Sequence, residues 1–261
     1  MIKSSIGIMA MLSFSFLANA QNLSQYQKNY LINRGDTLPY RLLLPLKYDP
    51  SRTYPLVFFM HGAGERGSDN EKQLTHGAQL FLRDDVRKRH PAIIVFPQCP
   101  ENSFWSNVAF ARDSSGKVQF NFAGNNPPTK AMDLAQRLLH DIINGYPIDK
   151  ESIYVGGLSM GAMGTYEMVA RNPGIFAAAI AICGGGNPAN AKKMNKTNWW
   201  IFHGAKDNVV PPKLSEEMKD ALKAAGAKVK YTVYPEADHN SWDSAFAEPT
   251  LISWLFSQHK E

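Results

Sequence analysis

The sequence predicts a single α/β domain with a mostly parallel central sheet and helices on both faces. Short, continuously apolar runs at residues 56–60 and 92–96 are typical of strands buried on both faces of a parallel sheet. Such runs alternate with segments of helical periodicity, and the connections between them are short. The 261 residues fit one large domain, and neither an internal repeat nor an interdomain linker divides them.

The first half of the chain begins with an expected edge strand at residues 38–45, which has prolines at its margins. The buried strand at residues 56–60 follows after a turn-rich connection. Helical spacing then predicts one helix over residues 69–89, before the second buried strand at residues 92–96.

The second half continues the same alternation. Residues 176–182 have side chains small enough for a strand or a buried helix, and the glycines at 184–186 that end the run favour a strand. The other expected elements are a helix at 129–145, a strand at 153–155, a helix at 160–171, a strand at 199–202, a helix at 214–225, a strand at 229–234 and a closing helix at 249–258.

The N-terminus has the pattern of a secretory signal peptide. Lys3 supplies a positive start, residues 6–17 an apolar run, and Ala18-Asn19-Ala20 a cleavage pattern. The run is too short for a comfortable membrane span, and no stop-transfer pattern follows it. We therefore expect a signal peptide at residues 1–20 and a mature domain at 21–261. The mature protein would be secreted or periplasmic, without stable membrane insertion.

Charge and cysteine content narrow the possible partners. The formal net charge of +5 becomes +4 when Lys3 is removed, and the densest basic cluster, at residues 83–89, contains Asp84 and Asp85. This favours a solvated helix face over a nucleic-acid partner. Cys99 and Cys183 each follow an apolar run and are expected to be free thiols. No C-x-x-C or H-E-x-x-H spacing supports a metal site or a cofactor.

A glycine-rich turn places one serine at a position suited to nucleophilic attack. Gly157-Leu-Ser159-Met-Gly161 fits the G-x-S-x-G pattern, in which serine sits on a sharp turn between a strand and a helix. The flanking glycines relieve clashes with neighbouring elements, and the turn lifts the Ser159 hydroxyl clear of the sheet. A glycine-rich turn that happens to contain serine would look the same, so partner residues must decide.

Two further residues are predicted at the carboxyl ends of later strands, where active sites of such sheets collect. Asp207 follows the strand at 199–202, and His239 follows the strand at 229–234. His239 would accept the Ser159 proton, and Asp207 would orient and stabilise the imidazole. The rival carboxylates Asp238 and Asp243 lie too close to His239 in sequence, and His61 and His203 are interpreted as structural.

The same reasoning predicts two donors for a negatively charged oxygen in the transition state. The Met160 N–H would be exposed at a helix N-terminus. The second N–H is expected in the loop His61-Gly62-Ala63-Gly64, whose glycines allow amides to point into a pocket. Ala63 is the preferred donor and Gly62 the alternative. A plain tight turn fits the same residues.

The chain resembles secreted bacterial α/β-hydrolase esterases, a group that includes predicted peptidases and dienelactone-hydrolase-like carboxylesterases. It is more distantly similar to feruloyl and acetylxylan esterases. The motifs that carry this resemblance are Tyr40-Arg-Leu-Leu-Leu-Pro45, His61-Gly-Ala-Gly-Glu-Arg-Gly67, Pro97-Gln-Cys-Pro100 with Trp105, Gly157-Leu-Ser-Met-Gly161, His203-Gly-Ala-Lys-Asp207 and His239-Asn-Ser-Trp242. Ala162 stands where the group has glycine. The resemblance implies a Ser159–His239–Asp207 triad and ester hydrolysis through an acyl-enzyme.

The substrate is less well defined by the sequence. Residues 102–128 form an aromatic-rich insertion near the expected site, in which 118–122 fit half of a hairpin turned at 114–116. Trp105 is the preferred substrate contact, because an indole offers a flat apolar face. Glu65 and Arg66 fit a structural ion pair better than a substrate clamp.

The hypothesis is hydrolysis of a small-molecule or oligosaccharide ester, such as a feruloyl or acetyl ester of a plant-polysaccharide fragment. A serine peptidase, a lipase-like hydrolase and a non-catalytic binding domain are the alternatives, and the oligomeric state stays open.

Overall fold

The computed structural model describes residues 22–112, 114, 118–122 and 126–260. The predicted signal peptide and most of the predicted turn at 114–116 lie outside these residues. Among the described helices, none has the combined length and apolar character needed to cross a membrane.

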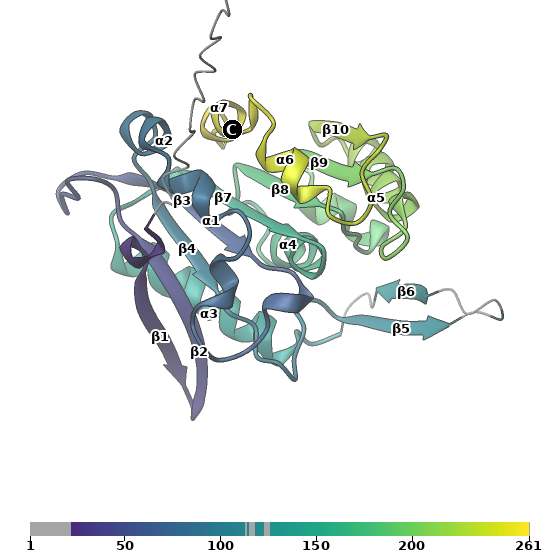
Figure 1. Cartoon of the computed structure of the whole chain (residues 1–261), viewed down its shortest axis with the longest axis horizontal. Coiled ribbons are helices and arrows are strands. Elements are labelled where there is room, and N and C mark those ends of the chain that lie inside the picture. The colour runs from purple at the N-terminus through teal and green to yellow at the C-terminus, as the bar shows by residue number, and fades with distance from the viewer. Residues whose placement is uncertain (1–21, 113, 115–117, 123–125, 261) are drawn as a thin grey trace, which may run out of the picture.

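A twisted eight-stranded sheet forms the centre of the described chain (Figure 1). Its spatial order is β1-β2-β4-β3-β7-β8-β9-β10. Strand β2 pairs antiparallel with β1 and with β4, and the pairs from β4 to β10 are all parallel. The strands are β1 (Gln27–Asn33), β2 (Asp36–Leu43), β3 (Tyr54–Met60), β4 (Ile93–Pro97), β7 (Ile148–Leu158), β8 (Ala178–Ile182), β9 (Asn198–Gly204) and β10 (Val229–Tyr234).

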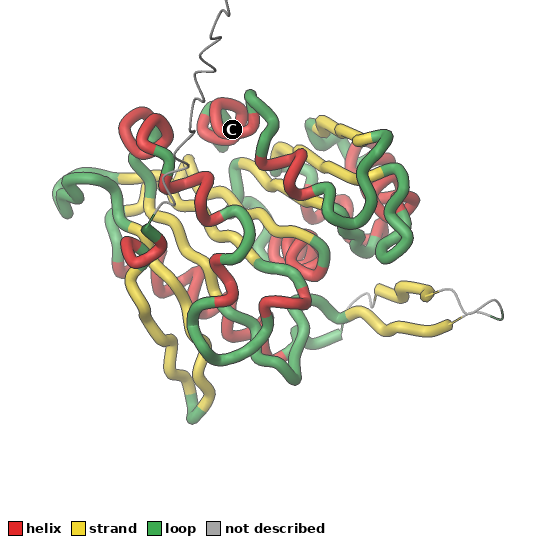
Figure 2. Tube along the Cα trace, in the orientation of Figure 1, coloured by secondary structure: helices red, strands yellow, loops and turns green. Residues whose placement is uncertain are grey.

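Helices cover both faces of this sheet, as Figure 2 shows in red against yellow strands. One buried cluster joins the sheet to α3, α4 and α5, and a second joins it to α1, α2, α6 and α7. The α helices are α1 (Ala78–Leu82), α2 (Asp84–Arg89), α3 (Lys130–Gly145), α4 (Met160–Arg171), α5 (Pro212–Ala224), α6 (Trp242–Phe246) and α7 (Leu251–Phe256). Short 3-10 helices are η1 (Leu23–Gln25), η2 (Ala63–Glu65), η3 (Lys72–Leu74) and η4 (Pro188–Met194). The predicted α/β architecture is confirmed.

Several element predictions need correction. The expected edge strand at 38–45 is β2, which lies inside the sheet because β1, formed by a mostly exposed polar segment, pairs with its outer edge. The single helix predicted over 69–89 is wrong. Gly77 has φ 81°, and Arg83 has φ −57° and ψ 133°, so the segment breaks into η3, α1 and α2. The closing helix is shorter than predicted, and α6 precedes it.

The insertion contains a separate antiparallel hairpin of β5 (Val108–Arg112) and β6 (Val118–Phe122). It projects from the body of the molecule beyond the end of α4 (Figure 1). Phe110 packs on Phe104 and on Phe120, with ring centroids 5.4 Å apart in both pairs. The prediction that 118–122 form half of a hairpin is therefore confirmed.

Candidate active site

The glycine-rich turn lies between β7 and α4, with Ser159 at its apex. Ser159 has φ 51° and ψ −117°, a conformation that non-glycine residues rarely adopt. Its N–H donates to Ile182 O at 2.8 Å. A Cβ on Gly157 would lie 2.3 Å from Gly161 O, and one on Gly161 would lie 2.0 Å from Met60 O. The two glycines are needed because α4 and β3 approach each other through bare main chain.

The three predicted catalytic residues come together in one hydrogen-bonded chain. Ser159 Oγ lies 2.9 Å from His239 Nε2, and His239 Nδ1 lies 2.8 Å from Asp207 Oδ2. The carboxylate accepts from Nδ1–H, which leaves Nε2 of the neutral imidazole free to accept the serine proton. The Asp207 side chain is fully buried, whereas that of His239 is 19% exposed. Substrate can therefore approach the base while the acid stays shielded from water.

Four donors surround the Asp207 carboxylate. Oδ1 accepts from the N–H groups of Val209 and Val210, each at 2.9 Å, and Oδ2 faces His203 at 3.1 Å as well as His239. Burial by itself would raise the pKa of Asp207. The hydrogen bonds outweigh burial, so the pKa of Asp207 lies well below its usual range. The carboxylate is thus held ionised, as a partner of an imidazolium requires.

His203 is a functional contact that the sequence reasoning missed. Its Nε2 faces two acceptors, Asp207 Oδ2 and Val210 O at 2.9 Å, so this nitrogen carries the hydrogen. Its Nδ1 lies 2.7 Å from Ser215 Oγ, which lies 2.8 Å from Gly184 O. His203 thus ties the catalytic carboxylate to the end of β8. Its place four residues before Asp207, at the end of β9, was the signal that could have revealed this.

The predicted oxyanion donors lie at the edge of the sheet that carries Ser159. Met160 is the first residue of α4 and Ala63 the first of η2, so neither N–H has an acceptor within its own helix. A Cβ on Gly62 would lie 2.9 Å from Leu158 Cδ1, which places the loop after β3 against the turn. The assignment of the two donors stays a prediction.

His61 anchors this loop to the neighbouring strand. Its Nε2 accepts from the Cys99 N–H at 2.9 Å, and its Nδ1 donates to Gly62 O at 2.6 Å. Burial lowers the pKa of His61 to about 4, so the ring is neutral near pH 7. These contacts are those of a residue that fixes loop backbone.

The sequence favoured an ion pair between Glu65 and Arg66, but the two side chains have other partners. Arg66 donates to the main-chain oxygens of Ala63, Glu101 and Ser103. Glu65 Oε1 instead lies 3.8 Å from His76 Nε2. Arg66 is a brace between the η2 loop and the insertion, because a guanidinium can serve several carbonyls at once.

The prediction that Trp105 contacts substrate is wrong in this structure. Its side chain is 0% exposed, and its indole N–H donates to His61 O at 3.2 Å. A Cβ on Gly164 would lie 2.5 Å from Trp105 Cβ, so the side chain is wedged against α4. The flat apolar ring that suited a pocket wall also suits a core position, and sequence does not distinguish the two.

The cysteines are buried free thiols, as predicted. Cys183, Asp207 and His239 have potential ligand atoms within 4.8 Å of one another, and other such groupings of metal-binding side chains are absent from the described residues. Burial raises the pKa of the Cys183 thiol well above its usual range, which disfavours the thiolate that a metal would need. The arrangement suits proton transfer better than metal binding.

Comparisons with known proteins identify a matching family and several similar proteins. Residues 49–249 match the family model for phospholipases and carboxylesterases. Acyl-protein thioesterase 1 of Neurospora crassa is 28% identical over 204 residues, covering 71% of this chain and 80% of the relative. The crystal structure of a thermostable esterase is 34% identical with a TM-score of 0.80. The match covers 90% of this chain but spans only 64% of the length of that esterase.

More distant structures share the fold. A ferulic acid esterase from Anaeromyces mucronatus, solved with ferulic acid, has a TM-score of 0.63 at 17% identity. The match covers 89% of this chain and 90% of that one. At this identity the similarity concerns the fold alone.

Proposed function

Since the chain belongs to the phospholipase/carboxylesterase family of α/β hydrolases, we propose that it is a serine esterase that cleaves carboxylic esters through an acyl-enzyme. The observation that carries the proposal is the continuous chain from Ser159 Oγ through His239 to Asp207, at 2.9 and 2.8 Å. Unpaired serine, histidine and aspartate side chains would support no such reaction.

The geometry suggests how each bond changes. Ser159 Oγ attacks the ester carbonyl carbon while His239 Nε2 takes its proton, and the carbonyl oxygen becomes an oxyanion facing the Met160 and Ala63 N–H groups. Collapse expels the alkoxide, which receives the proton from His239 and leaves as an alcohol. Water then attacks the acyl-enzyme with His239 as base, which releases the acid and restores the Ser159 hydroxyl. Asp207 stabilises the imidazolium in both halves.

We further propose export and a sugar-ester substrate. The positive start, apolar run and Ala18-Asn19-Ala20 support cleavage after residue 20 and a secreted or periplasmic enzyme. The motif resemblance supports feruloyl or acetyl groups on plant-polysaccharide fragments as the natural esters. N-terminal sequencing of exported protein tests the first claim, and a mature chain that still begins at Met1 would contradict it.

Thioester hydrolysis is a second candidate, favoured by the similarity to an acyl-protein thioesterase. The same nucleophile, base and oxyanion donors would act on a thioester, with a thiolate as leaving group in place of the alkoxide. Relative turnover of an acetate ester and a thioacetate of matched shape separates the two candidates.

Labelling with a fluorophosphonate tests the nucleophile directly. Wild type, Ser159→Ala and a control variant of an exposed serine on α7, Ser253→Ala, would be compared alongside p-nitrophenyl acetate and methyl ferulate hydrolysis. We expect labelling and turnover to vanish together in Ser159→Ala alone. A folded wild type that neither labels nor turns over any ester would contradict the proposal and favour a binding domain. Preference for peptides or long-chain lipids would redirect it to the peptidase or lipase alternative.

A further inference from the structure

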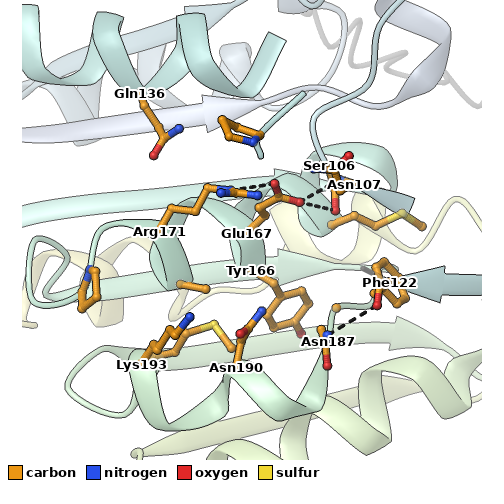
Figure 3. Close-up of a pocket in the computed structure, with 16 residues that line it drawn as sticks. Ser106, Asn107, Phe122, Gln136, Tyr166, Glu167, Arg171, Asn187, Asn190 and Lys193 are labelled. Atoms are coloured by element: carbon orange, nitrogen blue, oxygen red, sulfur yellow. Dashed lines mark hydrogen bonds and ion pairs between the residues drawn. The ribbon is translucent and has the colours of Figure 1, made fainter. Parts of the chain in front are cut away.

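The outward face of α4 borders a cavity of about 480 Å³ that the proposed mechanism does not use (Figure 3). Its floor is made by residues three or four positions apart on one side of the helix, namely Met163, Tyr166, Glu167, Ala170 and Arg171. Gln136 of α3 lies along one side, and Asn190 and Lys193 of η4 lie along the other. We call this cavity the α4 groove. Its volume lies within the range of roughly 300–1,000 Å³ common for small-molecule sites.

The groove runs along α4 away from the turn that carries Ser159, and its lining does not include Ser159, Asp207 or His239. The Met163 N–H donates to Ser159 O at 3.1 Å, so the near end of the groove lies one helical turn beyond Ser159. From Met163 to Arg171, the helix rises about 12 Å at about 1.5 Å per residue. At the same end, Gly186 follows closely after Gly184, where a Cβ would lie 3.1 Å from Ser159 O. The near end of the groove is thus the part that the alcohol portion of a substrate anchored at Ser159 would reach first.

The polar lining is rich in carboxamides, which both donate and accept hydrogen bonds. Asn107, Gln136, Asn187 and Asn190 all contribute to it. Within the described chain, the Asn190 carboxamide makes no hydrogen bond, whereas Gln136 Oε1 accepts from Asn172 and Asn187 Oδ1 accepts from the Ala189 N–H. Asn190 is thus the amide most available to a ligand. Hydroxyl groups, which also donate and accept, are its natural partners.

The charges in the groove give only a weak preference for an anionic ligand. Glu167 accepts from Ser106 Oγ at 2.8 Å, from the Asn107 N–H at 2.7 Å and from Arg171 Nε at 2.7 Å. This carboxylate is fixed in the wall, and it neutralises Arg171. Lys193 adds one exposed cation at the rim, where solvent screens it. The remaining field is weak, so a neutral ligand fits better than a phosphate or a uronic acid.

The lining mixes apolar and polar surface, which suits an acyl chain poorly. Phe122, Pro128, Met163, Pro173 and Met194 supply apolar surface in the same lining as the carboxamides. A bound hydrocarbon would strip water from those carboxamides without replacing their hydrogen bonds, which is unfavourable. A sugar ring presents both hydroxyls and an apolar C–H face, and Phe122 at the rim offers a flat surface to that face.

We propose that the α4 groove binds the neutral sugar portion of the ester, so that the alcohol being released is an oligosaccharide held along α4. This inference rests on the proposed esterase function and defines its leaving group.

The test measures binding separately from chemistry. Calorimetry on Ser159→Ala would use unesterified xylotetraose as the neutral probe and a galacturonic acid tetramer as the acidic one. The same titrations would be repeated on two double variants of this protein. Asn190→Ala removes the free amide, and Ala170→Leu fills the floor of the groove. Lys192→Ala, an exposed neighbour on η4 outside the groove, serves as matched control. We expect xylotetraose to bind, with affinity reduced about fivefold or more by Asn190→Ala, the effect of one lost hydrogen bond, and reduced also by Ala170→Leu, which occupies the floor.

Turnover on two esters completes the test. With Ser159 intact, Asn190→Ala should raise the KM for an acetylated xylo-oligosaccharide, whereas the control Lys192→Ala should leave the turnover of that ester and of p-nitrophenyl acetate unchanged. If p-nitrophenyl acetate is turned over normally but xylotetraose does not bind, the groove assignment is wrong and the esterase proposal is unaffected. Stronger binding of the acidic tetramer than of xylotetraose would lead to the same conclusion. Absence of turnover on every ester would reject the esterase, and calorimetry would still decide whether the groove binds sugar.

Discussion

The two ends of the proposed substrate path are built in opposite ways. In the catalytic corner, formed by the ends of β3, β7, β8 and β9 around Ser159, no methyl group could be added to Gly157 or Gly161 without a main-chain clash. In the α4 groove, one turn away, there are about 480 Å³ of space and the unpaired amide of Asn190. Chemistry needs atoms fixed to within fractions of an ångström, whereas recognition of an alcohol tolerates variation. The difference predicts that the corner is intolerant of substitution and the groove permissive.

The largest expected effect is that of Asp207→Asn on turnover. An asparagine would leave His239 without its anionic partner and favour the wrong imidazole tautomer, which costs about 10⁴-fold in turnover in the type case of this triad. Hydrolysis of p-nitrophenyl acetate by folded protein, checked by circular dichroism, measures it. A loss below tenfold would mean that the corner does not depend on its buried acid.

Gly161→Ala should damage stability as well as turnover. The new Cβ would lie 2.0 Å from Met60 O and 2.7 Å from His61 O, both main-chain atoms that cannot rotate away. Overpacking of this kind costs roughly 1–3 kcal/mol or more. Urea unfolding of this variant beside Asn190→Ala in the groove sharpens the comparison, since Asn190 is only half-buried and its variant should stay within about 0.5 kcal/mol of wild type. An equal loss of stability in the two variants would contradict the predicted difference between the corner and the groove.

Acid should weaken the corner through His61. Burial holds its pKa at about 4, below the usual 6.5, so in this pH range the unfolded chain binds a proton that the folded chain does not. The free energy of unfolding therefore falls as the pH drops from 6.5 towards 4, by up to about 1.4 kcal/mol per pH unit. When the free energy of unfolding, measured with urea, is plotted against pH over this range, the slope should be shallower for His61→Gln than for wild type. The matched variant His140→Gln, at an exposed position on α3, should keep the wild-type slope.

The smallest effect on turnover that we expect in the corner is that of His203. His203→Ala removes a donor from the Asp207 carboxylate and leaves a cavity, and we expect a loss of about 2 kcal/mol in stability, typical of a hydrogen bond to a charged group. It should also lower kcat about tenfold with an unchanged KM. Without the His203 contact, Asp207 would tilt and shift His239 by a fraction of an ångström, which is enough to slow proton transfer. His203→Gln keeps a side-chain donor and should recover part of the kcat. Loss of stability without any change in kcat would show that His203 serves the fold alone.

The predictability of these regions from sequence follows the same division. The buried strands around the corner were found because continuous apolar runs, glycines and residues at strand ends are local patterns with one main structural meaning. Their partners fell into place because parallel strands bring their carboxyl ends to one edge. The contact between His203 and Asp207 was missed because its sequence signal, a spacing of four residues at the end of β9, does not fix the side-chain directions on which the contact depends.

The errors elsewhere have physical reasons. Residues 69–89 have helical spacing throughout, but positive φ at Gly77 and extended backbone at Arg83 break the segment to fit it against the sheet. Strand β1 was missed because its side chains are mostly exposed and carry little apolar periodicity. Trp105 was misplaced because the residues it packs against, Gly164 and His61, lie 59 and 44 positions away in the chain.

Ser159, Asp207 and His239 lie far apart along the chain, so the recovery of ester hydrolysis can also be used to follow refolding. Asp207 meets His239 only after β10 has paired with β9, the outermost parallel pair of the described sheet. Pairing of distant parallel strands is the slow part of folding such chains. Trp105 is buried in the core, whereas the Trp200 N–H donates to Thr232 Oγ1 of β10 at 3.0 Å, so the Trp200 ring reports on this pairing. During refolding, we expect the Trp200 contribution to fluorescence and ester hydrolysis to recover together, when the last strand docks.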